Sequence, residues 1–234
     1  MEPSTHPITA SASFGSRAAD EFLAASGAWP PRAWLVDVVD RLERVLALTD
    51  SSDPPLPRHA VDLGCGAGNE ALELLRRGWS VHAIDAHAPC LESTRRRAEE
   101  AGVAAGLTLE LAAFEHLRLP ARTYTLVHAG FSLPFCRADA FEGLWRQVTD
   151  ATLPRGFFAG QFFGAREPLI LQAEPGSVTS HSPESIERLL GVGGEPSWNA
   201  TQIHEVDRPG RGARGEPKHW HLFHVVLERE SAPP

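Results

Sequence analysis

The chain has 234 residues, 42% of them hydrophobic, with 22 Lys and Arg residues against 30 Asp and Glu residues and a formal net charge of -8. This size and composition suit one globular domain, with or without an extension. The negative charge disfavours a nucleic-acid partner. No apolar run approaches the ~18 residues of a membrane span, and the first residues lack the pattern of a secretory signal, so we expect a cytoplasmic protein without a membrane partner. Cys65, Cys90 and Cys136 form no CxxC pair, which argues against a disulfide framework or a zinc site.

Residues 1–31 are predicted to be an N-terminal extension with a short helix over 16–26. Pro30 and Pro31 then interrupt the chain, and apolar residues recur at helical spacing from Trp34 to Leu46, which predicts a second helix. We therefore expect the main domain to span residues 32–234.

From residue 59 onward, short apolar strands alternate with amphipathic helices, which is typical of a parallel sheet with helices on both faces. The expected strands are 60–63, 79–84, 107–112, 124–129 and 157–163, and the expected helices are 69–77, 89–101 and 139–152.

The end of the chain has a different pattern. Ser182 and Pro183 suit the N-cap and first position of a helix that runs to about residue 190. Strands are expected at 198–206 and 219–228, joined by a Gly-, Arg- and Pro-rich loop over 208–217, so they can form an antiparallel hairpin. The sequence thus predicts an α/β fold: a seven-stranded, mostly parallel sheet with helices on both faces and a C-terminal antiparallel hairpin.

A glycine-rich turn follows the first strand in Asp62-Leu63-Gly64-Cys65-Gly66-Ala67-Gly68. Glycines let the backbone approach a ligand closely, and the following helix offers free N–H groups at its start. The spacing is GxGxG rather than the GxGxxG of dinucleotide sites. The carboxylate of Asp62 would repel a pyrophosphate but suits an ammonium group. This pattern therefore favours an adenosine that carries an amino acid over a dinucleotide such as NAD.

Asp85 ends the second strand, 17 residues after Gly68. A carboxylate in this place can accept hydrogen bonds from both ribose hydroxyls, as the acidic residue does in dinucleotide folds. The alternative is an ordinary helix cap, but the position after a glycine turn favours the ribose role.

Together, these residues resemble the class I S-adenosylmethionine-dependent methyltransferases, over about residues 32 to 230. The resemblance implies a Rossmann-like fold, S-adenosylmethionine as cofactor, and methyl transfer to a small-molecule acceptor. Three segments, 132–136, 160–164 and 215–221, resemble more narrowly the tellurite-resistance-like subgroup. A [DNS]-P-P-[YFW] motif, which many relatives that methylate nucleic acids or proteins carry after the fourth strand, is absent here.

The resemblance also implies which residues bind the cofactor. Asp62 and the turn from Gly64 to Gly68 would hold the methionine part, and Asp85 would hold the ribose. Ala113 stands where many relatives have Asp or Asn, so adenine would depend on the Phe114 N–H and apolar walls. The full set of expected cofactor-binding residues is Arg32, Asp62, Gly64, Cys65, Gly66, Gly68, Asp85, Ala86, Ala113, Phe114, His128 and Ala129.

His128 and His219 are the candidates for catalysis. His128 stands at the carboxyl end of the fourth strand, beside the expected methyl donor, and His219 begins the last strand. A general base is needed only when the nucleophile carries a proton of high pKa. Either histidine could instead be structural, and the pair His219 and His221 lacks an evident third ligand for a metal.

The acceptor is expected to lie against Phe131, Arg166 and Trp29. Aromatic residues near the N-terminus suit either a lid that excludes water or plain core packing; they are Phe14, Phe22, Trp29 and Trp34. A non-catalytic protein that binds S-adenosylmethionine is the alternative function, and the sequence leaves the acceptor and the oligomeric state open.

Overall fold

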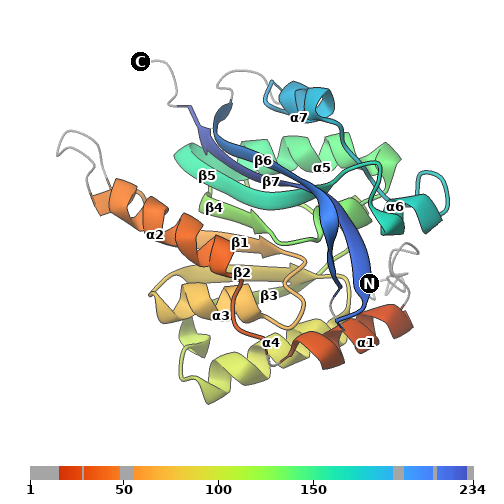
Figure 1. The fold of residues 1–234 in the computed structure, drawn as a ribbon. Coiled ribbons are helices and arrows are strands. Elements are labelled where there is room, and N and C mark those ends of the chain that lie inside the picture. The colour runs from red at the N-terminus through yellow and green to blue at the C-terminus, as the bar shows by residue number, and fades with distance from the viewer. Residues whose placement is uncertain (1–15, 28, 48–54, 192–197, 213–214, 231–234) are drawn as a thin grey trace, which may run out of the picture.

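The computed structural model describes residues 16–27, 29–47, 55–191, 198–212 and 215–230. Its seven-stranded sheet has the order β3-β2-β1-β4-β5-β7-β6. The first five strands run parallel, β7 runs antiparallel to β5, and β6 pairs antiparallel with β7 (Figure 1). This confirms the predicted fold class. The strands are β1 (His59–Leu63), β2 (Ser80–Asp85), β3 (Leu107–Leu111), β4 (Tyr124–Ala129), β5 (Thr152–Phe163), β6 (Trp198–Arg211) and β7 (Pro217–Arg229).

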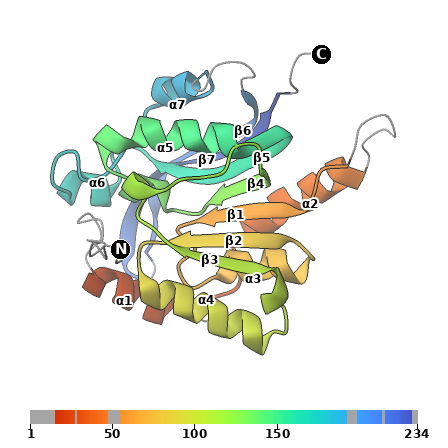
Figure 2. The ribbon, with the colours of Figure 1, turned by 180° about the vertical axis from the view of Figure 1, so that it is seen from behind.

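Helices cover both faces of the sheet, as Figure 2 shows from behind. The apolar sides of α2, α3 and α4 pack on one face, and those of α5 and α7 pack on the other. Trp145 of α5 is 1% exposed and lies at the centre of the second layer, where its ring meets Phe158 and Phe162 of β5. The helices are α1 (Ser16–Ser26), α2 (Ala33–Ala47), α3 (Asn69–Arg76), α4 (Ala88–Glu100), α5 (Ala138–Ala151), α6 (Pro168–Gln172) and α7 (Pro183–Leu189), with short 3-10 turns at Ala104–Gly106, Phe114–His116 and Leu133–Phe135.

The C-terminal hairpin is longer than the sequence predicted. Half of the segment expected as a loop, 208–217, is strand, since β6 continues to Arg211 and β7 begins at Pro217. Pro209 has no backbone N–H to donate, and it is tolerated because β6 is an edge strand with a neighbouring strand on one side only. Pairing across the hairpin thus overrides the local preference of its Gly, Pro and Arg residues for a turn.

One strand boundary and one helix also differ from the prediction. β5 begins at Thr152, before the predicted start at 157, and the five-residue helix α6 was not predicted. Such a short helix leaves too little apolar periodicity to be recognised. None of the helices that the structure describes is long and apolar enough to cross a membrane.

His181 is a buried titratable group that connects α7 to the sheet. Its backbone pairs with Gly164 just beyond β5, and its ring centroid lies 4.7 Å from that of Phe141 and 5.0 Å from that of Phe162. Burial lowers its pKa from 6.5 to about 4. The folded chain therefore holds this ring neutral over a pH range in which the unfolded chain protonates it.

We predict that this histidine makes the fold sensitive to acid. As the pH falls from 6.5 to about 4, the unfolded state takes up the proton first, so the free energy of unfolding decreases by as much as about 3 kcal/mol. His181→Phe should remove this part of the pH dependence of the free energy of unfolding, which urea titrations at several pH values measure. His116→Gln, at an exposed position, is the matched control; an unchanged pH dependence in His181→Phe would contradict the assignment.

Candidate functional site

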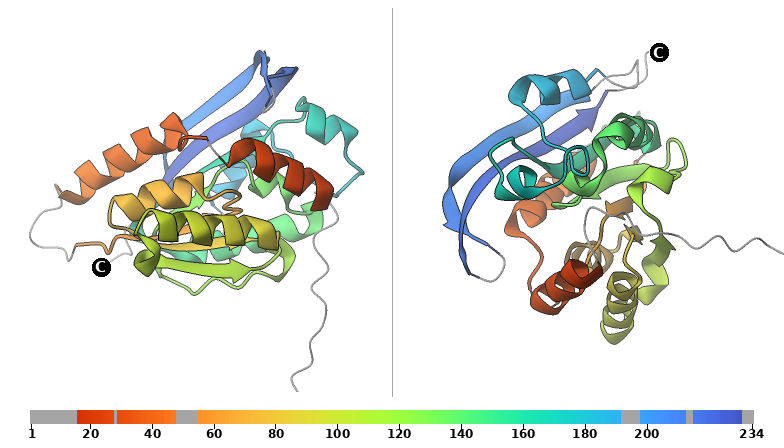
Figure 3. Two further views of the ribbon diagram at one scale, coloured as in Figure 1. Left: turned by 90° about the horizontal axis from the view of Figure 1, so that it is seen from below. Right: turned by 90° about the vertical axis from the view of Figure 1, so that its right-hand side faces the viewer.

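A cavity of about 740 Å³ opens where β1, β2 and β4 end. The glycine turn and the ends of these strands form its floor. Residues of α1 and of the hairpin line it from opposite sides, and the end of β6 and the start of β7 approach α1 in Figure 1. Figure 3 shows the same elements from two further directions. The ends of parallel strands are where open α/β sheets bind ligands.

The three glycines of the turn have different physical roles. All three have positive φ angles, 74° at Gly64, 54° at Gly66 and 78° at Gly68. A Cβ on Gly66 would meet only the Phe22 ring at 3.6 Å, so this backbone faces the cavity. A Cβ on Gly68 would lie 2.5 Å from the Thr94 hydroxyl oxygen. Gly68 does not line the cavity; its glycine is explained by the close packing of α3 against α4.

Asp62 and His128 form a buried pair on the cavity floor. Parallel pairing of β1 with β4 places them side by side, and the Asp62 Oδ1 lies 2.7 Å from the His128 Nδ1. Each residue is 1% exposed. An ionised carboxylate only accepts hydrogen bonds, so Nδ1–H is the donor of this pair, and in the neutral ring Nε2 is the acceptor. Within the described part of the chain, neither Asp62 Oδ2 nor His128 Nε2 has a partner.

Asp85 holds the glycine turn from the neighbouring strand. Its Oδ2 accepts the Gly66 N–H at 2.9 Å, and its Oδ1 accepts the His87 N–H at 2.9 Å. Burial raises the pKa of this carboxyl, while the two N–H groups act in the opposite direction. Each oxygen has a second lone pair, and Asp85 and Ala86 both line the cavity.

Arg32 reaches the cavity from the segment between α1 and α2. Its backbone N–H and its NH1 donate to Glu70 Oε1 at 3.2 and 2.7 Å, and its guanidinium carbon lies 4.9 Å from the Phe131 ring centroid. Glu70 is 5% exposed in the first turn of α3, where a carboxylate is stabilised by the helix N-terminus. The arginine is therefore fixed in the wall by one ion pair and one aromatic face.

Other expected cofactor residues also line the cavity. Ala113 and Phe114 lie in its wall. His128 lies in its floor, but the neighbouring Ala129 does not line the cavity. Cys65 lines the cavity too, but burial, followed by the charges of Asp85 and Asp62, raises the pKa of its thiol well above the ordinary value. This thiol is consequently a neutral wall group rather than a nucleophile.

Helix α1 is held over the cavity by polar contacts. Asp20 Oδ1 lies 2.8 Å from the His87 Nε2, and the Ser26 carbonyl accepts from Asn69 Nδ2 at 3.1 Å. Phe22 and Trp29 line the cavity in edge-to-face contact, with centroids 6.0 Å apart. Trp34 instead packs against the His224 ring at 5.3 Å, and Phe14 lies outside the described residues.

The opposite end of the cavity contains Phe131, which the sequence predicted, and four residues that the sequence did not indicate. We call Phe131, Phe163, Leu169, Lys218 and Trp220 its aromatic end. The Phe131 ring lies 6.3 Å from that of Phe163 and 5.8 Å from that of Trp220, in edge-to-face geometry. Alternation along the last strand, which puts Lys218 and Trp220 on one face, is the signal that could have found them.

Phe131 adopts a strained backbone that a buried amide maintains. Its φ is 59°, a left-handed conformation that a bulky residue seldom adopts. The Phe131 N–H donates to Gln161 Oε1 at 3.1 Å, and Gln161 Nε2 donates in turn to His224 Nδ1 at 3.2 Å. Gln161 is fully buried. This amide was not predicted, although such strain is typical of functional sites.

Arg166 and His219 do not reach the cavity. Both bind Asp207: the Arg166 guanidinium pairs with its carboxylate, and the His219 Nε2 lies 2.7 Å from Oδ1. In β7, His219 and His221 point to the face opposite Lys218 and Trp220. The structure therefore places the predicted catalytic His219 and substrate residue Arg166 on the far side of the hairpin.

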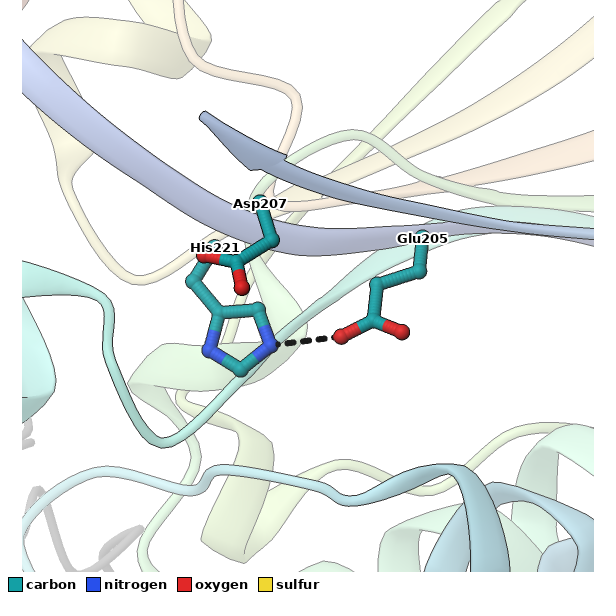
Figure 4. Close-up of side chains that lie close together, drawn as sticks. All are labelled: Glu205, Asp207 and His221. Atoms are coloured by element: carbon teal, nitrogen blue, oxygen red, sulfur yellow. Dashed lines mark hydrogen bonds and ion pairs between the residues drawn. The ribbon is translucent and has the colours of Figure 1, made fainter. Parts of the chain in front are cut away.

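That side carries three groups close enough to surround a metal ion: Glu205, Asp207 and His221 (Figure 4). His221 Nδ1 accepts the Arg166 N–H at 2.9 Å, so its Nε2 carries the proton and donates to Glu205 at 2.9 Å. Coordination by Nε2 would require Nδ1 to bear a proton, which the Arg166 N–H opposes. We explain this cluster by the hydrogen bond from His221 to Glu205 and the ion pair between Arg166 and Asp207.

Known proteins with a methyltransferase domain are similar to this chain in sequence or in fold. Residues 60–156 match the family model described as a methyltransferase domain. No curated protein matches the chain. A solved structure titled for conversion of a disulfide bond into a thioacetal group during echinomycin biosynthesis is similar, with 18% identity, 86% of this chain and 82% of the other covered, and a TM-score of 0.60.

Two further structures have the same fold. TehB from Haemophilus influenzae is 14% identical over 83% of this chain and 62% of its own, with a TM-score of 0.63. An S-adenosylmethionine-dependent methyltransferase from Mesorhizobium loti is 20% identical over 74% of this chain and 94% of its own, with a TM-score of 0.55. These neighbours do not single out the tellurite-resistance-like subgroup. Residues 60–156 therefore match a methyltransferase domain, and the described chain has a Rossmann-like methyltransferase fold.

Proposed function

We propose that this chain transfers the methyl group of S-adenosylmethionine to a small-molecule acceptor in the cavity. The observation that carries the proposal is the pair of buried acceptor atoms on the cavity floor, Asp62 Oδ2 and His128 Nε2, which have no partner in the described chain. A buried acceptor without a donor is costly. An ammonium group carries several donors and a charge that suits the carboxylate.

His128 fits this binding role better than that of a general base. Its Nδ1 is bound to Asp62, and its Nε2 lies on the side of Gly130 and Arg32: a Cβ on Gly130 would be 3.2 Å from Nε2 and 3.3 Å from Arg32 NH1. An acceptor for an ammonium and a donor for a carboxylate thus lie close together. This arrangement suits the amino-acid part of the cofactor.

The other parts of the cavity suit the adenosyl group. Asp85, fixed by the Gly66 and His87 N–H groups, has lone pairs for the ribose hydroxyls. Ala113 and Phe114 offer an apolar wall and backbone for adenine. When bound, the cofactor supplies an electrophilic methyl group, which passes to the acceptor by in-line displacement while the electron pair of the broken bond stays on sulfur.

The chain's own contribution to the rate is mainly position and exclusion of water. The lid role of α1 is part of the proposal: Phe22 and Trp29 cover the cavity while Asp20 and Ser26 hold the helix to the floor. A small acceptor also fits the enclosed volume of about 740 Å³ that it shares with the cofactor.

Asp85→Ala should weaken the binding of S-adenosylhomocysteine at least tenfold, about 1.4 kcal/mol, because the ribose loses its acceptor. Methylthioadenosine, which has the same ribose but no amino-acid part, should lose affinity by the same factor. Calorimetry with both ligands measures this. Unchanged affinity for both would show that the ribose does not meet Asp85.

His128→Asn is the complementary test. An asparagine amide can keep the donor to Asp62 but removes the Nε2 acceptor. We expect S-adenosylhomocysteine to bind at least tenfold more weakly, about 1.4 kcal/mol, and methylthioadenosine to bind as in the wild type. A variant with a lower kcat but unaltered affinity for both ligands would instead make His128 a catalytic base. Failure of the wild-type chain to bind either ligand would refute the proposed function.

A further inference from the structure

We propose that the acceptor is an uncharged aromatic molecule, bound at the aromatic end of the cavity. This inference rests on the proposed methyl transfer and adds the chemical class of its substrate. It follows from which groups line this end and from the partners that their charges already have.

Three rings form most of the wall. Phe131, Phe163 and Trp220 meet at centroid distances of 5.8 and 6.3 Å with interplanar angles of 64°. Edge-to-face packing of this kind extends readily to a further ring. The indole N–H of Trp220 donates to the Arg211 carbonyl at 3.0 Å, and the Phe131 N–H donates to Gln161, so these two donors are already used within the protein.

Lys218, the cation among the residues of the aromatic end, is neutralised by the chain itself, and Arg211, which also lines the cavity, donates to the Gly215 carbonyl at 2.7 Å. Lys218 Nζ lies 2.6 Å from Glu167 Oε1, and this carboxylate is fully buried at the start of α6. Arg32, which is also paired with a buried carboxylate, that of Glu70, lies outside the aromatic end and is assigned above to the cofactor carboxylate. An anionic acceptor that recruited Lys218 would leave the Glu167 charge buried without its partner, which is strongly unfavourable.

A cationic acceptor is disfavoured for a different reason. Aromatic faces attract cations, but Lys218 Nζ already lies 3.7 Å from the Trp220 ring centroid, and the Arg32 guanidinium lies 4.9 Å from that of Phe131. These two ring faces are therefore already occupied, and a positive acceptor would in addition meet the sulfonium of the donor. An uncharged ring avoids both the buried carboxylate and the cations.

Three probes of one shape test this assignment: naphthol, naphthoate and naphthylmethylamine, titrated by calorimetry into the chain saturated with S-adenosylhomocysteine. We expect naphthol to bind at least tenfold more tightly than either charged probe. Trp220→Leu should weaken naphthol at least fivefold and leave the affinity for S-adenosylhomocysteine unchanged. Equal or tighter binding of a charged probe, or binding of none of the three, would overturn the proposal.

A single substitution should reverse the ranking. Glu167→Gln keeps an acceptor for the His221 N–H, which Glu167 Oε2 accepts at 3.3 Å, but releases the charge of Lys218. Naphthoate should then gain at least tenfold in affinity. Glu205→Gln, the same change on the opposite face of the hairpin, is the matched control and should leave the ranking unaltered.

No gain for naphthoate in Glu167→Gln would refute the charge argument. The affinity for S-adenosylhomocysteine, measured first in each variant, separates the two proposals. If the cofactor product binds and the probes behave otherwise, only the acceptor class is wrong; if it does not bind, the proposed methyl transfer itself fails.

Discussion

The site depends on one buried charge. Asp62 lies at the end of an inner strand with 1% of its surface exposed, and a carboxylate in such a place requires partners. Parallel register with β4 supplies one partner, His128, directly beside it. The second oxygen is left for a ligand. Since the pair is set by the backbone pairing of two central strands, its geometry does not depend on flexible loops.

The same sheet explains why the strand ends were predictable. Glycine turn, strand-end carboxylate and alternating strands and helices are local patterns, and the parallel sheet brings their ends to one edge. Asp62 and Asp85 could therefore be placed from the sequence, together with the backbone of Gly66. Gly68 was assigned to the cofactor because the sequence cannot distinguish a glycine that makes room for a ligand from one that makes room for a side chain. In the structure, Gly68 makes room for Thr94.

Of the residues that the sequence placed at the cavity and that do not line it, His219 belongs to the C-terminal hairpin and Arg166 pairs with it. Pairing between β6 and β7 extends through Gly and Pro residues that favour turns in isolation, so the local pattern gave the wrong strand ends. Alternation along the last strand separates His219 and His221 from Trp220, but it does not tell which face meets the cavity, so His219 was assigned to the cavity. Gln161 could not be predicted at all, because its role arises only where β5 passes behind Phe131.

The residues on the two faces of the hairpin have different contacts. On the far face, Asp207 binds both Arg166 and His219, and Glu205 binds His221, so the charges there stabilise the bend of the hairpin over the sheet. On the cavity face, Lys218 and Trp220 meet the acceptor end. Substitutions on the cavity face can change acceptor preference while the ion pairs behind keep the hairpin in place. Under the proposed function, specificity for the acceptor would reside in this hairpin, which the glycine turn and Asp85 do not determine.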